Sequence, residues 1–190
     1  DDDNPFRERL ARAMEKKGFT VSQAQGVKVG IEAVKSKKTP TCLIFSRQGT
    51  SAISRTEDQL SLINKGGYLI DESDNSDITL IASGSEVQLI IDAAKELKNH
   101  SISANVVSMP SLDLFLQQSE EFQSSVINPD KPILVVECSH PNSWYRILNR
   151  KDKVIGIESF GESAPGSELL EHFGFNTENV VNSAKSLLND

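Results

Sequence analysis

The chain has 190 residues and a net charge of −7, with 37% hydrophobic and 25% charged residues, a composition typical of a globular protein with its own core. Its basic residues are scattered, which argues against nucleic acid as the main partner. No apolar stretch approaches the roughly 20 residues that a membrane helix needs, and no secretory signal pattern opens the sequence. We therefore expect a cytoplasmic protein whose cysteines, Cys42 and Cys138, are reduced core residues inside strands.

The first elements that the sequence predicts are helical. A helix is expected over residues 5–17 and a second from residue 22 to about residue 35. A continuous apolar run then predicts a buried strand at 41–46. Residues 49–65 are polar and irregular, so we expect a linker there with at best one helical turn.

The clearest pattern lies in residues 77–97. A β-branched, apolar run at 78–82 predicts a buried strand, and an amphipathic helix follows the turn Ser83-Gly84-Ser85. Ser83 and Glu86 have the spacing of a capping box, in which a hydroxyl and a carboxylate bind backbone N–H groups of the first helical turn. A strand without alternation that leads into a helix is the opening half of a βαβ unit.

The same order of strands and helices continues to the end of the chain. An extended segment at 68–71 precedes the central strand, and further strands are expected at 103–108, 133–138 and 154–157. The expected helices lie at 112–116, 120–126, 141–148, 165–173 and 177–188. The predicted fold class is α/β: a three-layer α/β/α sandwich with a mostly parallel sheet, preceded by a partial α/β segment.

The strongest chemical signal is Ser46-Arg47-Gln48, at the carboxyl end of the predicted strand 41–46. Ligands of open α/β sheets bind at that edge, and the forked guanidinium of Arg47 suits a phosphate or a carboxylate. On the residues alone, a structural salt bridge at the end of the sheet is a slightly better explanation.

Three other candidates are weaker. Ser83-Gly84-Ser85 stands at a helix N-terminus, where anions bind, but a βα turn needs small residues in any case. Glu137 ends a predicted strand and has the chemistry for acid–base work, but spacing fixes no partner for it. Cys138 and His140 lack the second pair of ligands that a zinc site needs. A structural role is favoured for all of them.

A series of motifs shows a family resemblance. The chain resembles the C-terminal part of transketolase over about residues 21–189. The matching motifs are Thr39-Pro40, Ser46-Arg47-Gln48, Gly66-Gly67-Tyr68, Ala82-Ser83-Gly84-Ser85-Glu86-Val87, Val107-Ser108-Met109-Pro110, Glu137, Trp144, Ile155-Gly156, Phe160-Gly161-Glu162-Ser163-Ala164-Pro165-Gly166 and Phe173-Gly174-Phe175.

The resemblance implies two domains. Residues 1–64 correspond to a helical lead-in, the remnant of the pyrimidine-binding domain and a linker, and residues 65–190 to the transketolase C-terminal domain. The first of these domains departs from the family pattern in two places. Residues 1–20 match nothing in the family, and Gly49-Thr50 replaces the usual Asn-Leu.

The resemblance also implies an activity. Transketolases use thiamine diphosphate and a divalent metal, Mg²⁺, to transfer a two-carbon ketol unit between sugar phosphates, in active sites between the subunits of a homodimer. The resemblance assigns sugar-phosphate binding to Arg47, which reverses the preference for a structural salt bridge at this residue. The family's catalytic, cofactor-binding and metal-binding motifs are absent from this sequence. We therefore expect that this chain alone neither binds thiamine diphosphate nor turns over substrate, and that its partners are the remaining transketolase domains.

Two alternatives stay open. In the first, the chain is a non-catalytic module that serves dimerisation or binds a regulatory anion. In the second, it is the C-terminal domain of a related thiamine enzyme. Deoxyxylulose-phosphate synthase and the β subunit of a 2-oxoacid dehydrogenase are the related enzymes considered. Ser46-Arg47-Gln48 and the motif that begins at Phe160 favour transketolase over both.

Overall fold

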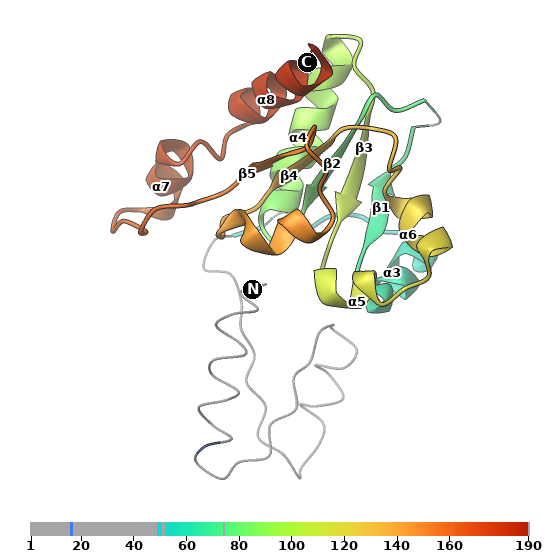
Figure 1. The fold of residues 1–190 in the computed structure, drawn as a ribbon. Helices are drawn as coiled ribbons and strands as arrows, with labels where there is room; N and C mark the ends of the chain where they lie inside the picture. Colours follow the sequence, from blue (N-terminus) through green and yellow to red (C-terminus); the bar gives the residue numbers. More distant parts are fainter. Residues whose placement is uncertain (1–15, 17–48, 51, 74, 190) are drawn as a thin grey trace. The chain divides into compact units, whose positions relative to one another are not determined.

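The structure is a computed structural model that describes residues 16, 49–50, 52–73 and 75–189 (Figure 1). The chain divides into two compact units, Asp1–Arg47 and Gln48–Asp190, and the fold below belongs to the second. The elements predicted at 5–17, 22–35 and 41–46 lie outside the described residues, apart from residue 16. The domain boundary expected between residues 64 and 65 stays a prediction.

A five-stranded sheet with the order β1-β3-β2-β4-β5 is the centre of the fold. Its strands are β1 (Tyr68–Asp71), β2 (Ile78–Ala82), β3 (Ala104–Ser108), β4 (Ile133–Val136) and β5 (Lys153–Ile155). β2 to β5 pair in parallel, while β1 pairs antiparallel with β3 at one edge. This confirms the mostly parallel sheet. β4 ends at Val136, so the strand predicted at 133–138 was too long, and Cys138 lies beyond the strand rather than inside it.

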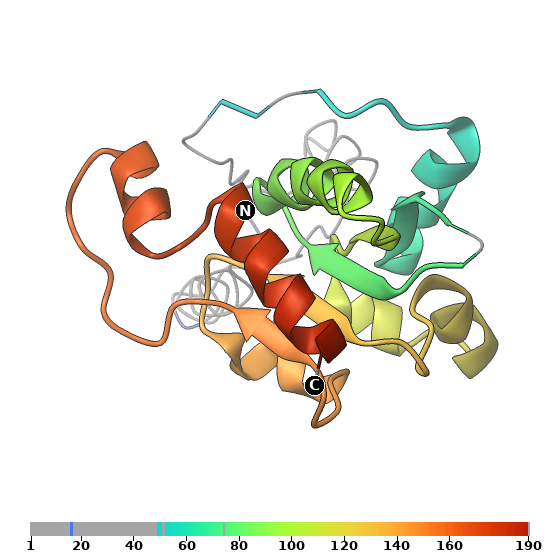
Figure 2. The same cartoon turned by 90° about the horizontal axis from the view of Figure 1, so that it is seen from above.

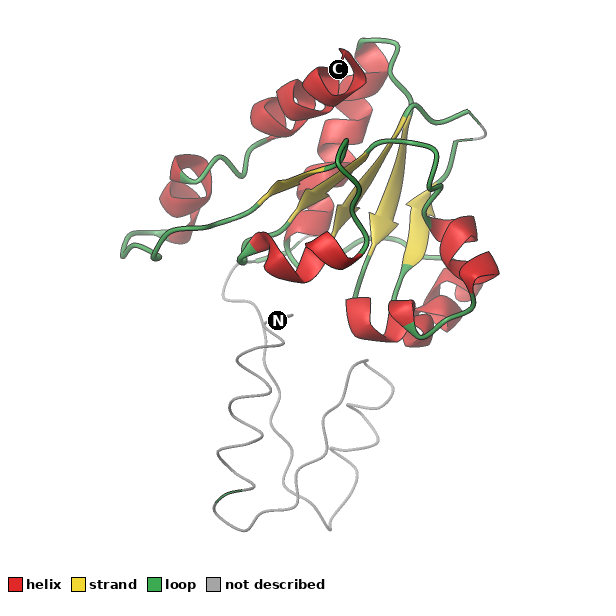
Figure 3. Cartoon of the chain, viewed as in Figure 1, coloured by secondary structure: helices red, strands yellow, loops and turns green. Residues whose placement is uncertain are grey.

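Helices cover both faces of the sheet, as the predicted three-layer sandwich requires (Figure 3). On one face lie α4 (Glu86–Asn99) and α8 (Thr177–Asn189), which share a core with Leu80 and Leu134. On the other lie α5 (Leu112–Leu116), α6 (Glu120–Val126) and the 3₁₀-helix η2 (Pro141–Arg146), around Ile81 and Val135. Figure 2 shows α4 and α8 from above.

The two cores explain the sequence pattern of the strands. Leu80 and Ile81 are neighbours on β2, yet they belong to different cores because successive side chains of a strand point to opposite faces. Every residue of β2 and β4 is therefore buried, which is why neither strand alternates between apolar and polar residues.

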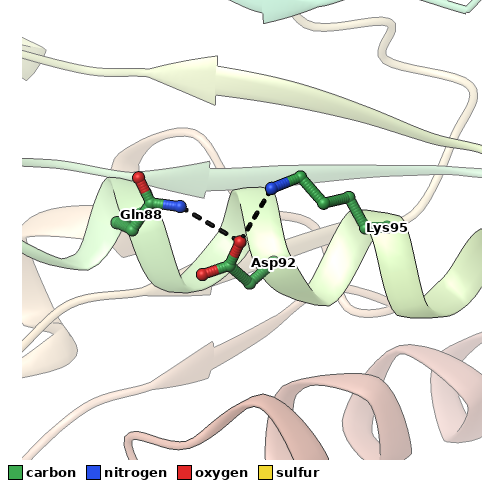
Figure 4. A network of polar contacts seen from close by, with 3 residues as sticks. All are labelled: Gln88, Asp92 and Lys95. Atoms are coloured by element: carbon green, nitrogen blue, oxygen red, sulfur yellow. Dashed lines mark hydrogen bonds and ion pairs between the residues drawn. The ribbon is translucent and has the colours of Figure 1, made fainter. Parts of the chain in front are cut away.

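Helix α4 packs one face on the sheet and exposes the other. Its buried apolar residues are Val87, Ile90, Ala93 and Leu97. On its polar side the Asp92 carboxylate accepts hydrogen bonds from Lys95 Nζ at 2.9 Å and Gln88 Nε2 at 3.0 Å (Figure 4). These bonds, chiefly the one from Lys95, hold the pKa of Asp92 below its ordinary value although partial burial opposes them. Such i,i+3 and i,i+4 contacts support a solvent-facing helix surface.

The segment predicted as a linker is more regular than its composition suggests. It contains α3 (Glu57–Leu62) and the 3₁₀-helix η1 (Ile63–Lys65). Thr56 and Gln59 form a capping box that was not predicted, with bonds of 3.2 Å and 3.0 Å. Gln59 Nε2 also donates to the carbonyls of Leu69 and Ile70 on β1, at 2.9 Å and 3.1 Å. These bonds attach α3 to the edge strand.

The last part of the chain contains α7 (Gly166–His172), which has no buried residue, before α8 begins. Helix α7 starts one residue later than predicted, so Pro165 is its N-cap residue rather than its first helical residue. None of the helices that the structure describes is long and apolar enough to span a membrane.

Candidate functional site at the carboxyl ends of the strands

Ser83 and Glu137 meet at the carboxyl edge of the sheet. β2 and β4 are parallel neighbours with Ala82 paired to Val136, so the residues that follow the two strands lie side by side. There Ser83 Oγ donates a hydrogen bond to Glu137 Oε2. Ser83 is 3% exposed and Glu137 9% exposed, so the bond is shielded from water. A hydrogen bond from a hydroxyl to a buried carboxylate is among the stronger polar contacts in proteins.

Glu86, the first residue of α4, adds a second carboxyl group to this edge. It is 8% exposed, and its Oε1 accepts a hydrogen bond of 2.6 Å from Ser85 Oγ. The predicted capping box of Ser83 and Glu86 is therefore wrong. The N-cap residue is Ser85, its side chain does not cap the helix, and the Ser83 hydroxyl is bound to Glu137 instead. Because α4 begins at Glu86, Ser83 stands before the N-cap and Glu86 is not at the third helical position that a capping box requires.

Cys138 lies against the same carboxyl groups. Burial raises the pKa of the Cys138 thiol, and the negative charge of Glu86, a hydrogen bond to Glu86 and the charge of Glu137 raise it further. The thiol therefore stays protonated at neutral pH, where a protonated thiol is a poor nucleophile and a poor metal ligand. Cys138 is a free cysteine in this structure, while Cys42, the other cysteine of the chain, lies outside the described residues.

His140 does not form a metal site with Cys138. Its side chain is exposed, and Nδ1 accepts a hydrogen bond of 3.3 Å from the backbone N–H of Asn142, which caps η2. Within residues 52–73 and 75–189, no group of three or more His, Cys, Asp and Glu side chains is arranged to hold a metal ion.

The charge of this edge determines what it can bind. Two buried carboxyl groups, Glu86 and Glu137, flank the turn Ser83-Gly84-Ser85, so a bound anion there would face like charge at short range. The anion-binding interpretation of the turn is not supported.

Glu137 has the Ser83 hydroxyl as a partner, and together they connect the ends of β2 and β4. The sequence places Ser83 and Glu137 each after a predicted strand, but only the strand order of the structure shows that these two strands are neighbours.

Arg47, the predicted sugar-phosphate ligand, lies outside the described residues. Its role as a ligand of the sugar phosphate therefore stays a prediction.

Comparisons with known proteins give the family. Residues 66–176 match the family model described as the transketolase-like TK C-terminal domain. The chain is 42% identical over 158 residues to transketolase 1 of Vibrio parahaemolyticus, covering 82% of this chain and 24% of that protein. It is also 42% identical over 161 residues to transketolase of Bacillus subtilis, covering 83% of this chain and 24% of that protein.

Solved structures agree with the sequence relatives. Transketolase from Leishmania mexicana matches 75% of this chain and 20% of its own, with a TM-score of 0.69 and 31% identity. Transketolase from Campylobacter jejuni matches 65% of this chain and 19% of its own, with a TM-score of 0.61 and 40% identity. The chain thus spans 24% of the length of the curated relatives it matches. It belongs to the transketolase family, and it carries that family's C-terminal domain.

Proposed function

We propose that this chain is the C-terminal part of a working transketolase, which transfers a two-carbon ketol unit between sugar phosphates. The observation that carries the proposal is the 42% identity to a transketolase over 82% of the chain. Transketolase structures from Pichia stipitis, 35% identical to this chain, are described as complexes with sedoheptulose 7-phosphate and with xylulose 5-phosphate. These complexes support sugar phosphates as the substrate class. The remaining transketolase domains, on the same or another polypeptide, form with this chain what we term the assembled enzyme.

The cofactors belong to those other domains in this proposal. The residues that the structure describes include no cluster of metal-ligating side chains, so they do not fit a metal-bound thiamine diphosphate. The family resemblance further supports a homodimer in the cytoplasm.

The proposed role of this domain is to complete the substrate site and to support the assembly. The alternative of a regulatory anion site is not favoured, because Glu86 and Glu137 present carboxyl groups at the edge where open α/β sheets bind ligands. The related thiamine enzymes are not favoured either, because the relatives described above are transketolases.

Arg47 is the proposed ligand of the sugar phosphate, supported by its place in the motif Ser46-Arg47-Gln48 and by the match of guanidinium to phosphate. In the assembled enzyme, Arg47→Ala should raise KM for xylulose 5-phosphate by about tenfold or more, because a hydrogen bond to a charged group is lost. The KM of a donor without phosphate should change little. Steady-state kinetics with both donors measures this difference.

A matched control is Arg150→Ala, which removes an exposed arginine far from this motif in the sequence. It should leave both KM values unchanged. An equal loss for the two donors in Arg47→Ala would remove Arg47 from the phosphate role. An assembled enzyme with no ketol transfer at all would contradict the proposed function itself.

A further inference from the structure

Residues 158–168, termed here the 158–168 segment, form the most exposed part of the fold. Every residue of the segment is exposed, and it includes the start of α7. Phe160 within it is 96% exposed, compared with 58% for Tyr145 and 44% for Leu60, the other exposed large hydrophobic residues of the described part. An aromatic ring that contacts almost nothing in its own domain contributes no burial to that domain.

The 158–168 segment is held at both ends, so its exposure is not that of a loose terminus. Before it, the Ile157 N–H donates a hydrogen bond of 3.0 Å to the Ser139 carbonyl. After it, Leu170 and Phe173 pack against the core that contains α4 and α8. Within this frame Glu162 Oε1 lies 3.4 Å from His172 Nε2. Figure 1 shows α7 and the chain before it extending away from the sheet.

The segment is part of the family's domain rather than an addition to it. The match to the transketolase C-terminal domain covers residues 66–176, which contain the whole segment. The motif Phe160-Gly161-Glu162-Ser163-Ala164-Pro165-Gly166, which resembles transketolase, lies in it. A motif whose residues are all exposed, and whose aromatic ring is 96% exposed, indicates a contact made outside its own domain.

The charge of the residues near Phe160 in the sequence indicates what kind of partner surface would fit the segment. Residues 154–184 contain no lysine or arginine, and the sequence on either side of Phe160 is acidic, with Glu158, Glu162, Glu168 and Glu171. A complementary surface therefore offers an apolar pocket for the ring, with basic side chains around it.

We propose that the 158–168 segment docks on the part of transketolase that this chain does not contain, with Phe160 inserted as the anchor. The inference rests on the proposed function. The match to this chain covers 24% of the curated relative, which is therefore about four times as long as the matched region. Most of the polypeptide surface available for docking thus lies outside this chain. A second copy of this chain lacks that length and is the competing occupant.

Hydrogen–deuterium exchange with mass spectrometry tests the contact. We expect the amides of 158–168 to exchange at least about tenfold more slowly in the assembled enzyme than in the chain alone, because docking excludes water from them. Equal exchange in an assembled, active enzyme would overturn this inference and leave the proposed function intact. Failure of the domains to assemble at all would contradict both. Protection that appears in the chain alone and rises with its concentration would identify a second copy and overturn the inference as well.

Two variants test whether Phe160 in particular anchors the contact, rather than any exposed aromatic ring. Phe160→Ser should leave the Tm of the chain alone unchanged, since the ring is 96% exposed there. In the assembled enzyme it should lower the Tm by about 2 to 4 °C and abolish the slow exchange of the segment. Tyr145→Ser, which removes a 58% exposed ring from another surface, is the control and should change neither measurement. Identical behaviour of the two variants in the assembled enzyme would refute Phe160 as the anchor.

Discussion

Replacing Ser83 by alanine tests whether the carboxyl edge is stabilised by the contact between Ser83 and Glu137. The substitution removes one hydroxyl and adds no atom, so it introduces no steric conflict. The lost hydrogen bond joins a residue that is 3% exposed to one that is 9% exposed, so water cannot easily replace the missing donor. A bond to a carboxylate in such surroundings contributes about 1.5–3 kcal/mol, and we expect the free energy of unfolding to fall by that amount.

Ser85→Ala is a matched control at the same edge. Ser85 Oγ also donates to a carboxylate, Glu86, at 2.6 Å, but Ser85 itself is only partly buried. Water can then take the place of its hydroxyl, so the expected loss is less than about 1 kcal/mol.

Urea unfolding followed by tryptophan fluorescence measures both variants. Trp144 is the single tryptophan of the chain and is 4% exposed in η2, so its emission reports the unfolding of this domain. A loss of 1.5–3 kcal/mol lowers the midpoint by about 1 M urea. A midpoint for Ser83→Ala that equals wild type, or a larger loss for Ser85→Ala than for Ser83→Ala, would refute this account of the site.

Two further predictions concern stability. Because the folded state raises the pKa of the Cys138 thiol, the unfolded chain loses this proton first, near the ordinary value of 9.0, so the free energy of unfolding should fall above that pH and not below it. Urea titrations between pH 8 and 10.5 should show a fall of up to about 1.4 kcal/mol per pH unit relative to Cys138→Ala, and parallel curves would contradict it. Gly66 has a φ of +92°, and a Cβ there would lie 2.3 Å from the Ser111 carbonyl oxygen and 2.4 Å from the Phe115 nitrogen. Gly66→Ala should therefore cost about 2–4 kcal/mol in the same assay, whereas Gly161→Ala, with open space around it, should cost less than about 0.5 kcal/mol; equal losses would be the contrary result.

Short helices with local signals were predictable from the sequence. The helices predicted at 112–116 and 120–126 begin and end as expected, because each has a serine at its N-cap that binds within its own first turn. Ser111 Oγ accepts from the Leu114 N–H at 3.4 Å, and Ser119 Oγ accepts from the Phe122 N–H at 3.3 Å. These contacts span three residues, so a linear sequence contains all the information they need.

Ser83 shows where that reasoning fails. It has the same chemistry and the same cap spacing to Glu86, yet its hydroxyl binds Glu137, 54 residues later in the chain. The helix begins at Glu86 with Ser85 as its N-cap, so Ser83 lies before the cap position, and its hydroxyl donates to a carboxylate at the end of the neighbouring strand. No local pattern around Ser83 contains the position of Glu137.

The sequence by itself determined the order of strands and helices in this domain, the mostly parallel sheet and the family. Apolar runs and helical periodicity are properties of neighbouring residues, and the family motifs are spelled out in the chain. The tertiary structure decided which side chains meet at the carboxyl edge, that residues 57–65 attach to β1, and that Phe160 has almost no contact in its own domain. These facts depend on strand order and packing between distant segments, which are set by burial of the whole core rather than by any stretch of sequence.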